Sequence, residues 1–589
     1  MNFLKNVLAT IVGIFVFCFF FFFLMITFGS VMAISSTTSG NVGVKRNSVL
    51  KLDLSEVTED YGGTVIIKEY GYAETNNEGL IDVLMAIDVA KNDSNIKGIS
   101  IENNVSGLGY TQRKAVREKL EEFKKTGKFV IAYADNYSQA EYYMNSVADT
   151  MYINPLGSID FKGLATEILY MKDLQDKTGI NMEVIRHGKY KSAVEPYLQQ
   201  NMSEENREQN TVLLQSIWNS LVNEISKSRK ISVDQLNSIA TNLDARSAEL
   251  ALQNQMVDKI AYIDEYQAAI KKALNIESDE DINEIEILDY INSLSPSLKR
   301  NSNQIAVIFA QGEIRGGEGS VNIIGEGSIN KALKKAREND DVKAIVLRVN
   351  SPGGSALTSD IIWREVELTK KIKPVIVSMG DVAASGGYYI ASNADYIFAE
   401  PTTITGSIGV FGAIPNVRKL ADKVGVNAEH VKTHENAVGY SVFEPMDEKT
   451  HSTITESIEK IYDVFLDRVA TGRKMSKEQV NEIAQGRVWT GTMAKENGLV
   501  DALGGLDSAI AYAAKMVNAE DYEISLYPEY EIKFEEMLRN FIGFSMKETK
   551  EQAIISEIGQ ENYEILKRVN YLKQASGVQA MLPYYMKIY

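Results

Sequence analysis

Cysteine and histidine are scarce in this chain, and their scarcity limits its chemistry. The 589 residues include one cysteine, Cys18, and four histidines. A single thiol excludes an intrachain disulfide and any metal site built on several thiolates. A histidine-rich metal site is disfavoured too, and we expect neither a metal nor another cofactor. A protease that uses histidine as its base has few candidates, among them His430 and His434.

Positive charge is also in deficit. There are 62 Lys and Arg residues against 79 Asp and Glu residues, which gives a formal net charge of −17. This balance disfavours nucleic acid or an anionic lipid surface as the main partner. The hydrophobic share of 44% and the charged share of 24% are those of an ordinary globular protein.

One long uncharged segment, residues 7–28, lies near the N-terminus. A run of this length can span a hydrocarbon core as a helix, whereas the apolar part of a cleavable signal peptide is shorter. Small residues at 30–33 leave cleavage open as an alternative. We therefore predict a transmembrane anchor over residues 1–34, with contact to membrane lipid, and a flexible linker over 35–48. Because one N-terminal helix precedes a large body, we expect that body outside the membrane.

The body contains two copies of one unit. Ordered matches recur at an offset near 246 residues, which is too long a period for a solenoid and indicates duplication of a whole domain. The matches include Tyr142-Tyr143 with Tyr388-Tyr389, Gly157-Ser158-Ile159 with Gly406-Ser407-Ile408, and Gly179-Ile-Asn with Gly425-Val-Asn. We place the first copy at 49–300, the second at 301–520, and a C-terminal extension at 521–589.

Each copy alternates short apolar runs with helical periodicity. In the second copy, residues 344–349 and 374–379 read as buried strands, and residues 358–370 between them read as an amphipathic helix. Strand, helix and strand at this spacing predict a β-α-β crossover. The expected fold class is therefore α/β, with helices covering a sheet in each of two tandem domains.

Two glycines follow the first of these strands, in Ser351-Pro-Gly353-Gly354. Glycine lets the backbone bend sharply, and exposed N–H groups at a strand-to-helix turn can hold an oxyanion. The alternative is a plain structural turn.

Ser385 follows the next strand, in Ala383-Ala-Ser385-Gly386-Gly387-Tyr-Tyr. A serine at a helix N-terminus benefits from the positive end of the helix dipole, and Gly386 could add its N–H to an oxyanion site. The alternative is a serine that merely caps the helix. The first copy has Gln139 at the matching position, so the candidate nucleophile is present in one copy.

A nucleophilic serine needs a base. The first copy carries Lys189 and Lys191 after His187, whereas the matching stretch of the second copy, residues 434–440, has no lysine. One copy thus keeps lysine and the other keeps serine, as expected if a duplicated enzyme shares one active site. A lysine can act as base when burial lowers its pKa, although most lysines are solvated surface residues. These residues alone leave the choice between the two lysines open.

These motifs together resemble the long form of the signal peptide peptidase A family (protease IV). They are Ser-Pro-Gly-Gly at 351–354, Ala-Ala-Ser-Gly-Gly-Tyr-Tyr at 383–389, Thr-Gly-Ser-Ile-Gly-Val at 405–410 and Tyr-Lys-Ser-Ala-Val-Glu-Pro at 190–196. The resemblance covers nearly the whole chain, and it implies the crotonase and caseinolytic-protease fold in both copies.

The resemblance also implies the site and the setting. It places the catalytic serine on Ser385, its lysine on Lys191, the lysine-orienting serine on Ser407, and the oxyanion hole at Gly353, Gly354 and Gly386. It further implies an endopeptidase that degrades cleaved signal peptides as a homotetramer. The enzyme would sit in a bacterial inner membrane, with its catalytic body on the extracytoplasmic side.

Three other readings remain. The first is a Ser/His/Asp protease on the same fold, with His430 or His434 as base. The second is an acyl-coenzyme A enzyme of crotonase type, since that fold also uses paired amides for an oxyanion. The third is a membrane scaffold without catalysis.

Overall fold

The computed structural model describes residues 13–17, 19–21, 43–67, 72–294, 303–532 and 579–581. Within these ranges, no helix combines the length and the hydropathy that a membrane crossing requires. Most of the predicted anchor, and of the predicted linker, lies outside the described residues. Of the anchor, residues 13–17 and 19–21 are helical.

The first copy is built on a six-stranded parallel sheet with the order β10-β7-β5-β4-β1-β11. The central strand β5 reads FVIAYA, a continuous apolar run, and β4 reads IKGISIE with five of its seven residues buried, as expected where helices cover both faces of a parallel sheet. The strands are β1 (Ser48–Lys51), β4 (Ile96–Glu102), β5 (Phe129–Ala134), β7 (Thr150–Ile153), β10 (Lys259–Ile260) and β11 (Asn283–Glu286).

The second copy repeats this order as β22-β18-β17-β15-β12-β23, again with parallel pairs. The end of β17 also pairs with β19, which pairs with β21. The strands are β12 (Gln304–Gln311), β15 (Val342–Ser351), β17 (Val375–Ala384), β18 (Tyr396–Ala399), β19 (Ile404–Gly406), β21 (Val488–Thr490), β22 (Ala502–Leu503) and β23 (Glu523–Tyr527). The identical strand order confirms the predicted duplication of an α/β unit.

The helices repeat in the same order. The predicted crossover is present as β15, α13 and β17, with both strands longer than expected from their apolar runs. First-copy helices are α2 (Leu80–Asn92), α3 (Tyr110–Lys124), α4 (Gln139–Asn145), α5 (Lys172–Thr178), α7 (Glu204–Arg229), α8 (Val233–Asn242), α9 (Ala248–Gln253) and α10 (Ile263–Leu274). Their second-copy counterparts are α12 (Glu326–Glu338), α13 (Ala356–Lys370), α14 (Gly386–Ala391), α15 (Arg418–Val424), α16 (Glu448–Arg473), α17 (Lys477–Ile483), α18 (Gly491–Glu496) and α19 (Leu506–Met516).

The other elements are the strands of three further sheets, with the orders β14-β13-β16-β25-β20-β9, β24-β2-β3 and β6-β8, and the short helices η1, α6 and α11. They are β2 (Thr64–Ile67), β3 (Tyr72–Thr75), β6 (Tyr137–Ser138), β8 (Ile159–Asp160), β9 (Asn181–His187), the 3-10 helix η1 (Ser192–Val194), α6 (Glu195–Leu198), α11 (Ile287–Ser293), β13 (Glu313–Ile314), β14 (Ile323–Ile324), β16 (Gly353–Ser355), β20 (Val410–Asn416), β24 (Glu529–Ile532) and β25 (Gln579–Met581).

The second sheet continues past residue 520, where we placed the end of the second copy. Its edge strand β23 pairs in parallel with β12, as β11 pairs with β1 in the first copy. The structural unit therefore ends after Tyr527. This strand could not be predicted by comparing the two copies, because the matching positions between them end at residue 501, before β23 begins.

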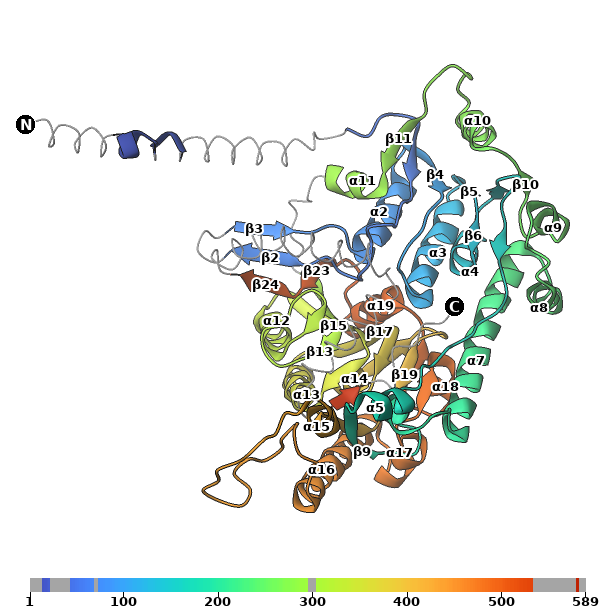
Figure 1. Ribbon diagram of the computed structural model, residues 1–589. Coiled ribbons are helices and arrows are strands. Elements are labelled where there is room, and N and C mark those ends of the chain that lie inside the picture. The colour runs from blue at the N-terminus through green and yellow to red at the C-terminus, as the bar shows by residue number, and fades with distance from the viewer. Residues whose placement is uncertain are drawn as a thin grey trace, which may run out of the picture.

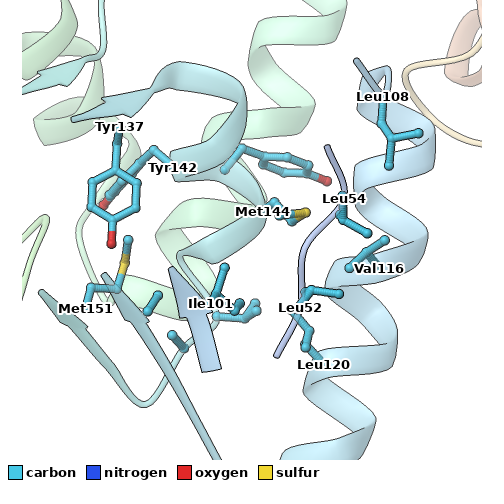
Figure 2. Packing of buried hydrophobic residues seen from close by; sticks show 14 of the residues in the cluster. Leu52, Leu54, Ile101, Leu108, Val116, Leu120, Tyr137, Tyr142, Met144 and Met151 are labelled. Atoms are coloured by element: carbon cyan, nitrogen blue, oxygen red, sulfur yellow. The ribbon is translucent and has the colours of Figure 1, made fainter. Parts of the chain in front are cut away.

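The end of β17, which immediately precedes Ser385 in the second copy, packs into the core of the first copy. Figure 2 shows part of that core, with the side chains of Leu54, Ile101 and Val116 among those that face one another. The same cluster of buried side chains includes Ala384, Ile404 and Val488 from β17, β19 and β21. The end of β17 is thus held by apolar contacts from both copies.

Elements of the first copy also reach across to the second. In Figure 1, β9, drawn in teal, lies beside α16, and α7 runs down along the second copy. The strand β9 pairs antiparallel with β20, and the hydroxyl of Ser216 on α7 lies 2.9 Å from that of Thr490 on β21. This crossing brings the loop after β9 to the end of β17.

Candidate active site

Ser385 occupies a strained turn between β17 and α14. Its φ of 54° is positive, which is uncommon for a residue other than glycine and costs about 1–3 kcal/mol. Its N–H donates to the carbonyl oxygen of Gly406 at 2.8 Å, and its carbonyl accepts from Tyr389 N at 2.8 Å. The side chain makes no capping hydrogen bond to the helix, so the reading of Ser385 as a mere cap is wrong.

The hydroxyl of Ser385 instead meets the amine of Lys191. Lys191 lies in the loop between β9 and η1, and its Nζ is 2.9 Å from Oγ of Ser385. The same Nζ is 3.0 Å from Oγ of Ser407 and 3.1 Å from the carbonyl oxygen of Ser407. Lys191, Ser385 and Ser407 each have 0% of their surface exposed. The fold thus joins side chains that lie 194 residues apart in the chain.

Burial controls the charge of this amine. It lowers the pKa of Lys191 well below its ordinary value of 10.5, because a charged ammonium loses its hydration inside the protein. The ring of Phe411 lies near the amine, with its centroid 6.0 Å from Nζ. In the described part of the chain, no carboxylate forms an ion pair with Lys191 that would favour its charged form.

The competing bases lie elsewhere. Lys189 is exposed and pairs with Glu205 at 3.4 Å. Nε2 of His430 lies 3.4 Å from a carboxylate oxygen of Glu444, and the His434 ring contacts the neighbouring Thr433. Among the described residues, the side chain within hydrogen-bond distance of Ser385 Oγ is that of Lys191. The structure brings together the predicted Lys191, Ser385 and Ser407, and their roles remain a prediction.

A glycine that the sequence analysis missed holds the backbone of Lys191 in place. Gly486, from the second copy, has φ +78°, and a Cβ added there would lie 2.6 Å from Cβ and 2.7 Å from the backbone nitrogen of Lys191. The preceding carbonyl, of Gln485, accepts from Tyr190 N at 2.8 Å. An isolated glycine before a strand gives no sequence signal of such a contact, because its partner comes from the other copy.

Replacing Gly486 with alanine should therefore displace Lys191. We expect kcat for peptide cleavage to fall about 100-fold, since a misplacement near 1 Å can have an effect of that size. The matched control is Gly127→Ala, which has a similar φ of +85° but open space around the added methyl group. Steady-state kinetics of both variants would separate two causes of a lower kcat, the displacement of Lys191 and the strain of an alanine at positive φ. Equal rates in the two variants would contradict this role.

The predicted oxyanion glycines lie around Ser385. A Cβ added to Gly387 would lie 2.7 Å from the carbonyl oxygen of Ser351, so the Ser-Pro-Gly-Gly turn contacts the start of α14. Gly353 and Gly354 have φ of +98° and +154°, and the N–H of Gly353 donates to Ser351 Oγ at 3.1 Å. Gly386 is the first residue of α14, where a backbone N–H has no acceptor within the helix.

Among the described residues, the counterparts of Ser385 and Lys191 form no equivalent site. Gln139, the counterpart of Ser385, is buried and bonds through its side chain to the backbone of Lys162 and Gly163. The counterpart of the Lys191 loop, residues 434–440, is mostly exposed. The serine of one copy and the lysine of the other therefore form a single site where the copies meet.

A short strand from the C-terminal region lies beside this site. The strand β25 pairs antiparallel with β16, placing Met581 opposite Gly353 and Ala580 opposite Gly354. It also pairs with β20 at Phe411. An extended peptide thus occupies the space between the Ser-Pro-Gly-Gly turn and Phe411, which the sequence analysis did not predict for residues 521–589.

The family model for peptidase family S49 matches the chain twice, over residues 122–277 and 367–520. One match falls in each copy. "Protease 4" of Haemophilus influenzae is 36% identical over 574 residues, which cover 92% of this chain and 92% of that protein. The chain belongs to peptidase family S49. As a member of this family it is a serine peptidase.

Other relatives agree with this S49 assignment. "Protease 4" of Salmonella typhi is 38% identical over 459 residues, covering 76% of this chain and 74% of that protein. "Serine protease SPPA, chloroplastic" of Arabidopsis thaliana is 34% identical over 434 residues, covering 72% and 64%. The serine-peptidase prediction is confirmed, and the acyl-coenzyme A and scaffold readings are set aside.

Proposed function

We propose that this S49 peptidase cleaves peptides with a Ser/Lys dyad, in which Ser385 is the nucleophile and Lys191 the general base. The observation that carries the proposal is the 2.9 Å distance between Lys191 Nζ and Ser385 Oγ in a buried site. Because burial lowers the pKa of Lys191, it favours the neutral amine, which can accept the hydroxyl proton.

The reaction would proceed in two halves. In the first, Lys191 Nζ takes the proton of Ser385, Oγ bonds to the scissile carbonyl carbon, and the carbonyl oxygen becomes an oxyanion. Collapse of this intermediate breaks the C–N bond, and the lysine ammonium gives its proton to the leaving amine. In the second, the neutral lysine takes a proton from water, whose oxygen attacks the ester carbonyl carbon. Collapse of this second intermediate breaks the bond between that carbon and Oγ, and the lysine ammonium returns its proton to Ser385 as the acid leaves.

Ser407 would orient the amine during these steps. Its carbonyl and hydroxyl oxygens lie 3.1 Å and 3.0 Å from Nζ, so both can accept from the amine's N–H bonds. The lone pair of the neutral amine would then point to Ser385. The oxyanion would be held by the N–H groups of Gly386 and of the turn at Gly353 and Gly354, with the oxyanion replacing Ser351 Oγ as acceptor for Gly353.

We place the substrate as an added strand where β25 now lies. The ladder between β16 and β25 presents backbone donors and acceptors to an extended peptide beside Ser385, a common mode of peptide recognition. Phe411, whose backbone pairs with Gln579 of β25, would contact the bound peptide. Released signal peptides carry an apolar segment that could bind as such a strand.

The proposed setting follows from the N-terminal segment. Residues 7–28 would anchor the chain as a single-pass protein in a bacterial inner membrane, with the catalytic body on the extracytoplasmic side. We propose a homotetramer as the working assembly. Anchoring near the bilayer would place the site close to signal peptides left after preprotein processing.

The proposed substrate class can be tested with the full chain in detergent. A synthetic signal peptide should be cut internally, whereas the same sequence at the head of its folded preprotein should persist, since it is not free to enter as a strand. Mass spectrometry of both reactions gives the cleavage products. Equal cleavage of the two, or no cleavage of the free peptide while other peptides are cut, would contradict this substrate assignment.

A further inference from the structure

Lys191 lies in an irregular loop between β9 and η1, outside the helices and strands. Its side chain is a flexible four-carbon stem, so Nζ stays 2.9 Å from Ser385 Oγ only if the backbone of the loop is held in place. Gly486 contacts this backbone from the second copy. Within the first copy, a cluster of buried polar side chains beneath the loop does the same.

Arg186 holds the carbonyl group of Lys191. It lies on β9, five residues earlier in the chain, and its Nη1 donates to the carbonyl oxygen of Lys191 at 3.1 Å. The same nitrogen lies 3.8 Å from Oε1 of Glu195, which is 1% exposed. That carboxylate accepts from the Ser203 hydroxyl at 2.6 Å and from Nδ2 of Asn206 at 2.9 Å. The guanidinium thus links the backbone of Lys191 to a carboxylate that the start of α7 fixes.

Gln209, one turn further along α7, holds the residues on either side of Lys191. Its Nε2 lies 2.8 Å from Ser192 Oγ and 3.3 Å from the carbonyl oxygen of Tyr190. Its Oε1 accepts from the N–H of Val488, on β21 of the second copy, at 3.5 Å. One side chain therefore connects the lysine loop of the first copy to the sheet that carries the serine.

The second copy indicates that a helix in this place does not need the cluster. The helices α7 and α16 each have 26 residues and begin after a capping side chain, Ser203 or Asp447. Counting from these caps, the exposed Thr453 of α16 stands where α7 has the buried Gln209. Burying polar groups is unfavourable unless they are hydrogen-bonded, and a bonded network is rigid. The copy that keeps the lysine is the copy that has this network.

We propose that Arg186, Glu195 and Gln209 are positioning residues for the general base. Arg186 and Gln209 hold the backbone at and beside Lys191, so that its amine stays within hydrogen-bond distance of the serine. Glu195 acts through Arg186, whose guanidinium it orients. The inference rests on the proposed Ser/Lys dyad, and it assigns the side chains that keep the two groups of that dyad together.

The first test is Arg186→Met, which removes the donor to the Lys191 carbonyl. We expect kcat for peptide cleavage to fall about 100-fold, since a misplacement near 1 Å can have an effect of that size. KM should change little, because the lost bond is made to Lys191 and not to the peptide. An amine that leaves its buried site regains water, so the pH of half-maximal kcat/KM should rise. Arg186→Lys, which keeps a charged donor, should recover most of the rate.

Arg229→Met is the matched control. Arg229 ends α7, and its Nη2 donates to the carbonyl oxygen of Gln255 at 3.1 Å and to a carboxylate oxygen of Asp258 at 2.9 Å. This variant loses the same two kinds of bond at the opposite end of the helix. It should lower the melting temperature and leave both kcat and the pH profile unchanged. An equal fall of kcat in the Arg186 and Arg229 variants would overturn the inference.

The second test uses side chains of matched size. Glu195→Gln and Gln209→Leu should each lower kcat about tenfold, because each loses hydrogen bonds within the network. Combined with Arg186→Met, Glu195→Gln should cause no further fall, since residues that act through one another are not additive. Effects that multiply in the double variant would contradict the role of Glu195.

Lys191→Met, measured beside these variants, separates this inference from the dyad. Cleavage that Lys191→Met abolishes but that Arg186→Met and Gln209→Leu leave at the wild-type rate would overturn the positioning role alone. Cleavage that survives in Lys191→Met would overturn the dyad, and this inference with it. Loss of kcat in all three variants, with a raised pH profile in Arg186→Met, is the result that we expect.

Discussion

Replacement of Ser385 with alanine is expected to lower the rate of peptide cleavage by on the order of 10⁴-fold or more, with little change in stability. Loss of the nucleophile in serine proteases has effects of this size, and the residual rate comes from oxyanion binding and substrate positioning. Stability should change little because the Ser385 side chain caps no helix and its bond is to the amine of Lys191.

The measurement is kcat/KM with a fluorogenic peptide, beside a thermal melt of each protein. Ser392→Ala is the matched control, since Ser392 is also buried and lies at the other end of α14, where its hydroxyl bonds to the carbonyl of Tyr389 at 2.8 Å. It should retain activity within about tenfold. If the Ser385→Ala protein cleaved the peptide at the wild-type rate, Ser385 would not be the nucleophile.

Replacement of Lys191 with methionine should lower kcat by about 10³-fold or more, because general-base removal leaves the Ser385 hydroxyl un-ionised. Methionine fills similar space without an amine, so the buried site keeps its shape. Lys189→Met is the control, since Lys189 is exposed and bonded to Glu205. It should cut peptides at the wild-type rate. A Lys189 variant that loses activity while the Lys191 variant keeps it would reverse the assignment.

The same variant carries a prediction for stability against pH. The folded-state pKa of Lys191 is lowered, so between that pKa and about 10.5 the unfolded chain binds a proton that the folded chain does not. This difference destabilises the wild type at neutral pH. Lys191→Met should therefore gain stability relative to the wild type at pH 7, and the gain should shrink as the pH rises towards 10.5. Denaturant unfolding at several pH values measures it.

The sequence predicted the duplication and the two halves of the site because these depend on local pattern. Buried parallel strands leave continuous apolar runs such as 344–349, and two copies at one offset show which residues differ between them. The loss of lysine from one copy and of serine from the other indicated a shared site. The choice of Lys191 over Lys189 needed the family resemblance.

What could not be predicted depends on pairing across the whole chain. The contact of Gly486 with Lys191 joins residues from different copies, and nothing near Gly486 in the sequence marks it. The strand β25 lies beside Gly353 and Gly354 only because a C-terminal segment folds back over more than 200 residues. The second sheet extends past its predicted boundary at residue 520 for the same reason. Its last strand, β23, is recognisable as a strand mainly through its pairing with β12.

The proposed mechanism depends on proton transfer from Ser385 to the buried, uncharged amine of Lys191. The pH dependence of kcat/KM for a peptide substrate tests this step most directly. The profile should reach half its maximum well below pH 10.5 and be lost in Lys191→Met. A rate that climbs only as an ordinary lysine titrates near pH 10.5, or an unchanged profile after removal of the amine, would contradict the account.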